Sequence, residues 1–323
     1  MRKLLILIFF CVSGFAAEHP GTDEFIKEAV SDYGLQETDV RKLLAGAEYQ
    51  QSIVDAISRP AEGKPWYEYK KIFLTDTRIR HGIEFWTEHA DLIRAVSEKF
   101  GVDEEIIVAI IGVETSYGRN TGGYRTVDAL VTLGFYYPQN LSSDRSGFFS
   151  RELLQYIQLA KEEDLPASEI TGSYAGAMGM GQFMPSSYRE YAVDFDGDGK
   201  RDLWRSTPDV VGSVANYLHR HGWQPGKPVT RRARASQNAA FDMIKRDLKP
   251  TLTVAEWAEK GFTSSSELFP DLPAAVLKLV EKDRNTYYLT FKNFWVITRY
   301  NRSPRYAMAV YDLSQAIKKG MER

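Results

Sequence analysis

The segment from Ile106 to Gly118 is almost wholly apolar and carries one carboxylate near its end. On a helix of about 3.6 residues per turn, Glu114 falls on the same face as Ile107 and Ile110. A carboxylate pressed against branched aliphatic side chains loses hydration, so its pKa should rise. A proton held near neutral pH is what a general acid needs. The competing interpretation is a Glu that reaches solvent at a fraying helix end.

A second segment, residues 172–186, is rich in glycine and also contains Tyr, Met and Phe. So many glycines indicate a backbone that turns tightly or lets another group approach closely. A flexible linker would not carry these large apolar side chains. From Gly172 to Ser187 the chain contains no Asp or Glu. A reaction at Glu114 would therefore find no second acid in this segment.

The overall composition excludes some classes of function. The 323 residues are enough for one large domain or for two to three lobes. The 41 Lys and Arg nearly cancel the 43 Asp and Glu, and no long basic tract is present, which argues against a general nucleic-acid binder. Aromatic residues make up 13% of the chain. They suit sugar rings but also fill ordinary cores, so they indicate a carbohydrate substrate only weakly.

The N-terminus has the order of a secretory signal peptide. A basic start is followed by an apolar run from Leu4 to Val12, which is too short to span a bilayer, and then by small residues. We expect residues 1–17 to be removed on export, which implies a periplasmic protein of a Gram-negative bacterium. Cys11 would be lost with the signal. A lipid anchor on Cys11 is the less favoured alternative, because Phe9 and Phe10 precede it.

Hydrophobic periodicity predicts a mainly α chain of the α+β class. We expect Asp76 and Asp103 to cap helices and Gly101 to end one. Further helices are predicted over residues 147–161, 209–221 and 306–318. Two strand-like runs are predicted over Tyr287–Leu289 and Phe294–Thr298.

Residues 194–202 have the spacing of an EF-hand loop, with acids at positions one, three, five and nine and Gly at position six. Oxygen ligands at this spacing suit a hard cation such as Ca²⁺. Arg205 stands where the loop usually supplies a Glu, so we expect the longer loop 194–209 to use Asp209 instead. The competing interpretation is an acidic surface turn. The predicted ligands of a structural Ca²⁺ are Asp194, Asp196, Asp198, the backbone carbonyl of Lys200, and Asp209.

Separate motifs follow one another along the chain at Gly112–Thr115, Gly172–Gly179, Gly181–Tyr188, Gly212–Tyr217 and Val296–Asn301. In these stretches the sequence closely resembles the bacterial membrane-bound lytic murein transglycosylase B family. The resemblance runs from about Tyr69 to Tyr311. Several motifs in the right order make it far more specific than any one of them.

The resemblance implies a goose-type lysozyme-like catalytic core over residues 99–225. Residues 18–98 would add a helical lobe. Residues 226–323 would add a small lobe with short strands, and its final helix would fold back on the core.

The activity that the resemblance implies is cleavage of the β-1,4 bond between N-acetylmuramic acid and N-acetylglucosamine in peptidoglycan. The muramyl C6 hydroxyl attacks the anomeric carbon and leaves a 1,6-anhydromuramic end. The family's single acid/base maps onto Glu114. The substrate-binding residues that carry over are Tyr69, Ser173, Gln182, Phe183, Tyr217, Tyr300, Asn301 and Tyr306.

Two other functions stay open at this stage. A true muramidase would hydrolyse the same bond with a positioned water. A peptidoglycan-binding scaffold without activity would be expected to lack Glu114 or the glycine-rich segment. The expected partners are glycan strands of peptidoglycan, with no nucleic acid and no organic cofactor, and partners among the wall-synthesis or division proteins are not predicted. Ser116, Tyr117 and Phe148 depart from the family pattern, which concerns substrate contacts and not the chemistry.

Overall fold

The computed structural model describes residues 18–59, 63–264, 266 and 268–322. The predicted signal peptide, with Cys11, lies outside these residues. The chain is mainly helical, and its described residues hold a five-stranded and a two-stranded antiparallel sheet, which confirms the predicted α+β class. None of the helices in the described ranges is long and apolar enough to span a bilayer.

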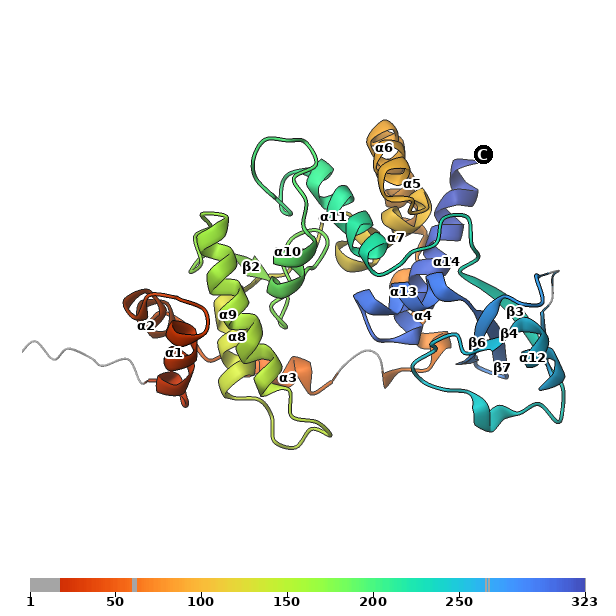
Figure 1. Cartoon of the computed structure of the whole chain (residues 1–323), viewed down its shortest axis with the longest axis horizontal. Coiled ribbons are helices and arrows are strands. Elements are labelled where there is room, and N and C mark those ends of the chain that lie inside the picture. The colour runs from red at the N-terminus through yellow and green to blue at the C-terminus, as the bar shows by residue number, and fades with distance from the viewer. Residues whose placement is uncertain (1–17, 60–62, 265, 267, 323) are drawn as a thin grey trace, which may run out of the picture.

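The N-terminal helices divide between two parts of the molecule. The first group lies beside α8 (Thr126–Phe135) and α9 (Ser146–Glu162), at the left of Figure 1. In the second group, α5 and α6 pack against α7 (Glu104–Thr115), and α4 packs against α14 (Pro304–Met321). Backbone N–H groups of Glu48 and Gln50 donate to Asp128 and Thr132 of α8, which fixes the first group. The elements are α1 (Thr22–Ser31), α2 (Glu37–Ala45) and α3 (Gln51–Ile57), then α4 (Trp66–Phe73), α5 (Asp76–Glu88) and α6 (Ala90–Phe100).

Helix α7 (Glu104–Thr115) is the centre of the core. It packs against α5, α6, α11 and α14, so it is covered on several sides (Figure 1). Ile107, Ile110 and Ile111 are fully buried. The remaining core elements are β1 (Tyr124–Arg125), α8 (Thr126–Phe135), α9 (Ser146–Glu162), β2 (Thr171–Gly172), α10 (Pro185–Tyr191), α11 (Thr207–Arg220), α13 (Lys292–Tyr300) and α14 (Pro304–Met321).

A small lobe at the lower right of Figure 1 holds a five-stranded antiparallel sheet in the order β4-β6-β7-β3-β5. It has its own apolar cluster, which includes Trp257, Phe262 and Leu289. The elements are β3 (Thr230–Ala235), a 3-10 turn (Phe241–Met243), β4 (Leu252–Thr253), α12 (Val254–Glu259), β5 (Phe262–Ser264), β6 (Pro273–Val280) and β7 (Asn285–Thr290).

Most of the predicted elements are found close to their predicted bounds. The helices over 147–161, 209–221 and 306–318 correspond to α9, α11 and α14, and Tyr287–Leu289 lies in β7. The strand over Phe294–Thr298 is wrong, because these residues belong to α13. A short run of buried apolar residues has no period that separates a strand from a helix. Here packing against α14 decides the outcome.

The predicted helix ends are confirmed in part. Gly101 ends α6 with a left-handed φ of 68°. Asp103 precedes α7 as its N-cap, although its side chain makes no capping hydrogen bond. The prediction for Asp76 is wrong by one residue, since the Thr75 hydroxyl accepts the Arg78 N–H at 3.2 Å. A Thr in extended conformation directly before the helix is the better acceptor for that N–H.

Candidate active site

Glu114 sits in the last turn of α7 and is half-buried. The Tyr306 hydroxyl, from the first turn of α14, donates to Glu114 Oε1 at 2.5 Å. Burial raises the pKa of Tyr306 well above its usual value, and the charge of Glu114 raises it further. The phenol therefore stays protonated and remains a hydrogen-bond donor to the carboxylate. The structure thus pairs two of the predicted site residues directly.

Three further predicted residues form an aromatic cluster next to this pair. The rings of Phe183, Tyr217 and Tyr300 lie with centroids 4.8 to 5.7 Å apart. The Tyr300 hydroxyl donates to the Gly181 carbonyl at 2.5 Å, and the Tyr217 hydroxyl donates to the Arg299 carbonyl at 2.6 Å. These two hydroxyls therefore donate to the backbone and not to the carboxylate.

Tyr300 nevertheless lies within the electrostatic reach of Glu114. Burial raises the pKa of Tyr300 well above its usual value, and the charge of Glu114 is the next cause. The bond to Gly181 ties α13 to the glycine-rich segment, 119 residues away in sequence. The C-terminal segment thus folds back onto the core, as the resemblance implied.

The glycine-rich segment folds into tight turns that use two predicted residues internally. The Ser173 hydroxyl oxygen accepts the N–H groups of Ala175 and Ala177 at 3.2 and 3.1 Å. The Gln182 side-chain amide donates to the carbonyls of Thr121 and Gly179 at 3.1 and 2.9 Å. Both side-chain N–H donors of Gln182 thus bond backbone carbonyls, and only its amide oxygen can accept a hydrogen bond from a substrate.

The last two predicted residues come from α4 and from the link between α13 and α14. Tyr69 of α4 is buried, with its ring 5.2 Å from that of Phe73, and it acts electrostatically on Tyr306. Asn301 follows α13 and is half-buried, and its side-chain oxygen accepts the Ser303 N–H at 3.0 Å. Tyr69 is thus a core residue close to Tyr306, while Asn301 shapes the start of α14.

Sequence reasoning missed Thr115, the neighbour of Glu114. Its buried hydroxyl donates to the Met180 carbonyl at 2.9 Å and accepts the Gly118 N–H at 3.0 Å. It therefore joins the end of α7 to the glycine-rich segment. A Thr near a helix end is common, so only its position next to Glu114 could have identified it from the sequence.

The predicted ion-binding loop lies between α10 and α11. Carboxylate oxygens of Asp194, Asp196 and Asp209 lie within 4.8 Å of one another. Asp209 is fully buried, and this burial raises its pKa, with the charge of Asp196 adding to the effect. Buried neighbouring acids are a setting that a divalent cation stabilises. Asp198 is outside this group of three, and its side chain accepts the Lys200 N–H at 2.8 Å.

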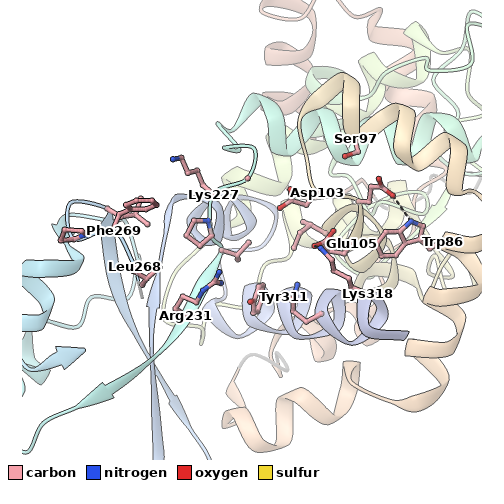
Figure 2. A pocket seen from close by; sticks show the side chains of 18 residues that line it. Trp86, Ser97, Asp103, Glu105, Lys227, Arg231, Leu268, Phe269, Tyr311 and Lys318 are labelled. Atoms are coloured by element: carbon pink, nitrogen blue, oxygen red, sulfur yellow. Dashed lines mark hydrogen bonds and ion pairs between the residues drawn. The ribbon is translucent and has the colours of Figure 1, made fainter. Parts of the chain in front are cut away.

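A cavity of about 1060 Å³ lies at the opposite end of α7 from Glu114. Figure 2 shows Asp103, Glu105 and Lys318 facing Arg231 and Phe269 across it. Lys318 and Glu105 pair with each other at 2.7 Å. Despite its volume, the cavity contains none of the predicted substrate residues, so we take the surroundings of Glu114 as the candidate active site.

Comparisons with known proteins agree with the geometry. The transglycosylase SLT domain model matches residues 17–315. Membrane-bound lytic murein transglycosylase B of Escherichia coli strain K12 is 37% identical over 316 residues, which cover 95% of this chain and 85% of that protein.

Solved structures extend the similarity to the fold. Soluble lytic transglycosylase SltB1 from Pseudomonas aeruginosa is 44% identical with a TM-score of 0.86, and covers 94% of this chain and 100% of its own. Escherichia coli Slt35 in complex with calcium is 36% identical with a TM-score of 0.84, and covers 95% of both chains. SltB3 from Pseudomonas aeruginosa in complex with NAG-anhNAM-pentapeptide is 32% identical with a TM-score of 0.78. The match covers 92% of this chain and 78% of the SltB3 chain.

These matches span nearly the whole chain and confirm the predicted family and its lysozyme-like α+β fold. The chain therefore belongs to the transglycosylase SLT family and is a lytic transglycosylase that acts on peptidoglycan.

Proposed function

We propose that this chain cleaves the β-1,4 bond between N-acetylmuramic acid and N-acetylglucosamine without water and leaves 1,6-anhydromuramic ends. The observation that carries the proposal is the hydrogen bond from Tyr306 to Glu114, together with the lack of a second acid in three segments near it. Residues 115–122, 172–188 and 299–306, which surround Glu114, contain no Asp or Glu. The relative SltB3 is described with an anhydro-muramyl peptide, which agrees with this product.

In the first step, protonated Glu114 gives its proton to the glycosidic oxygen as the bond to the muramyl anomeric carbon breaks. The developing positive charge at that carbon is stabilised by the oxygen of the muramyl N-acetyl group. The Tyr306 hydroxyl stabilises the Glu114 carboxylate that results, because a hydrogen bond to an ionised acceptor is stronger than one to a neutral acceptor. No protein nucleophile is required.

In the second step, the C6 hydroxyl of the same muramyl ring attacks the anomeric carbon. Glu114 takes the hydroxyl proton and returns to its starting state. One C–O bond breaks, one forms, and no water is consumed. The Ser173 hydroxyl can donate to the N-acetyl group, and the Gln182 amide oxygen can accept from a sugar hydroxyl. The cluster of Phe183, Tyr217 and Tyr300 supports the wall beside them.

The test is digestion of purified sacculi in ¹⁸O-labelled water, followed by mass analysis of the fragments. Transglycosylation gives ends that are lighter by one water and carry no label, whereas a muramidase would give labelled reducing ends. Glu114→Gln should release neither product. Glu104→Gln is the matched control, since it changes a carboxylate on the same helix about 15 Å away along its axis. Full activity of Glu114→Gln would remove Glu114 from the mechanism.

We also propose that the loop 194–209 binds Ca²⁺ through Asp194, Asp196 and Asp209, with Asp198 and the Lys200 carbonyl completing the oxygen set. The convergence of the three carboxylates supports this, and the relative Slt35 is described in complex with calcium. The ion would hold the loop against α11, the helix that carries Tyr217. It would stabilise the fold and take no part in the reaction.

We propose that the protein acts in the periplasm after export by residues 1–17. The substrate lies in that compartment, and the relative from Escherichia coli is named as membrane-bound. Within the described residues no helix could serve as a membrane anchor. Lipidation of Cys11 is the less favoured alternative, and it would attach the chain to the outer membrane.

A further inference from the structure

The turn that follows Glu114 contains two consecutive non-glycine residues in the left-handed backbone region. Ser116 has a φ of 51° and Tyr117 a φ of 62°. L residues with a side chain adopt this region at a cost, so a pair of them persists only where the surroundings enforce it. The N–H groups of both residues bond back to the last turn of α7, at 3.1 and 3.3 Å. The strained turn is therefore continuous with the turn that carries Glu114.

The Tyr117 ring fills a notch formed by two glycines on neighbouring helices. Its hydroxyl oxygen lies 2.4 Å from the position that a Cβ would take on Gly82 of α5. The same distance separates it from a Cβ on Gly112 of α7. The ring of Phe85 packs against it with the centroids 5.5 Å apart. Because a side chain at either glycine would displace the ring, the notch and the ring fit each other closely.

The hydroxyl of Tyr117 contributes to this fit through its volume and not through a hydrogen bond. It is buried and makes no hydrogen bond to any described residue. Burial raises the pKa of Tyr117 well above its usual value. A buried polar group without a hydrogen-bond partner lowers stability, so Tyr117 contributes to the structure through the packing of its side chain.

We propose that Tyr117 is a positioning residue, whose ring locks the strained turn between α5 and α7 and thereby aims the Glu114 carboxylate at Tyr306 and the substrate. The proposal rests on the proposed role of Glu114. Thr115 lies between the two residues and bonds the glycine-rich segment. Movement of the turn would thus shift Glu114 and the opposite wall of the site together. A shift of about 1 Å at a catalytic group is enough to lower a rate strongly.

The test compares Tyr117→Phe and Tyr117→Leu in steady-state kinetics on soluble, uncross-linked glycan strands. Phe keeps the ring and removes the unpaired hydroxyl, so we expect kcat within about twofold of the original and an equal or higher melting temperature. Leu loses the flat ring, so we expect kcat to fall by about tenfold or more while KM changes by less than about threefold. Tyr117→Met serves if the Leu variant does not fold, since Met also fills space without a ring.

The matched control is Phe262→Leu, the same loss of a buried ring in the separate core of the small lobe. It should lower the melting temperature and leave kcat unchanged. The proposal is overturned if Tyr117→Leu, or Tyr117→Met in its place, keeps its kcat, or if Tyr117→Phe loses as much as Tyr117→Leu. An inactive Glu114→Gln together with a fully active Tyr117→Leu would defeat this inference alone. An active Glu114→Gln would defeat the proposed function itself.

Discussion

The hydroxyl of Tyr306 donates a 2.5 Å hydrogen bond to Oε1 of Glu114, although the two residues are 192 positions apart in the sequence. One comes from the first turn of α14 and the other from the last turn of α7, and the two helices pack together in the core. The half-buried carboxylate therefore has a fixed neutral donor at its side. The Tyr306 hydroxyl can therefore influence the proton affinity of Glu114 without a second carboxylate nearby.

Replacing Tyr306 by Phe should lower kcat/KM by roughly ten- to a hundredfold, since a hydrogen bond to a charged group contributes about 1.5–3 kcal/mol. The pH–rate profile should also move to higher pH, because the lost donor favoured the ionised carboxylate. Steady-state kinetics between pH 4 and 9 measure both effects. Tyr300→Phe is the control, since its hydroxyl bonds the Gly181 carbonyl instead. Equal shifts of the profile in both variants would contradict the assignment.

Calcium should raise the melting temperature of the protein, and EDTA should reverse the change. An ion bound only to the folded state, present at about a hundred times its Kd, adds about 2.7 kcal/mol of stability. Asp209→Asn removes a ligand buried at the centre of the three-acid group and should abolish the response. Asp198→Asn should weaken the response less, because Asp198 stands outside that group. If neither calcium nor EDTA changed the melting temperature, calcium binding by this loop would be excluded.

Asp312 on α14 should make stability depend on pH. Burial raises its pKa from 3.8 to about 6, opposed by Lys70 and reinforced by Glu281. The folded state then holds the proton more tightly than the unfolded state. This contribution is fully present below about pH 4 and is lost as the pH rises through about 6.

Asp312→Asn should therefore stabilise the protein by about 2–3 kcal/mol at pH 7 and have little effect at pH 4. Urea unfolding at the two pH values measures the difference. Asp283→Asn, at an exposed carboxyl in the turn between β6 and β7, is the control and should change neither value. A stabilisation by Asp312→Asn that is the same at both pH values would show that the carboxyl charge is not its cause.

Export should leave a mature chain that begins at residue 17 or 18. Intact-mass measurement of protein purified from the periplasmic fraction tests this directly. A chain beginning at Cys11 with added acyl mass would instead establish the lipid anchor.

The sequence predicted those features that depend on local pattern. The apolar period around Glu114 predicted α7. The acids at alternate positions from Asp194 predicted a loop in which three carboxylates converge. Phe294–Thr298 was assigned to a strand because local pattern carries no information about which neighbour covers a short apolar run. The motif at Val296–Asn301 nevertheless placed the segment in the family.

By itself the sequence determined that Glu114 ends an apolar segment, that residues 115–122, 172–188 and 299–306 lack other acids, and in which order the elements follow. Each of these is a property of neighbouring residues. Only the tertiary structure decided that Tyr306 donates to Glu114, while Tyr217 and Tyr300 donate to backbone carbonyls. It likewise decided that Tyr117 packs between Gly82 and Gly112. Hydroxyl partners and ring packing depend on distances across the fold, and those distances follow from how α5, α7, α11, α13 and α14 pack, not from spacing along the chain.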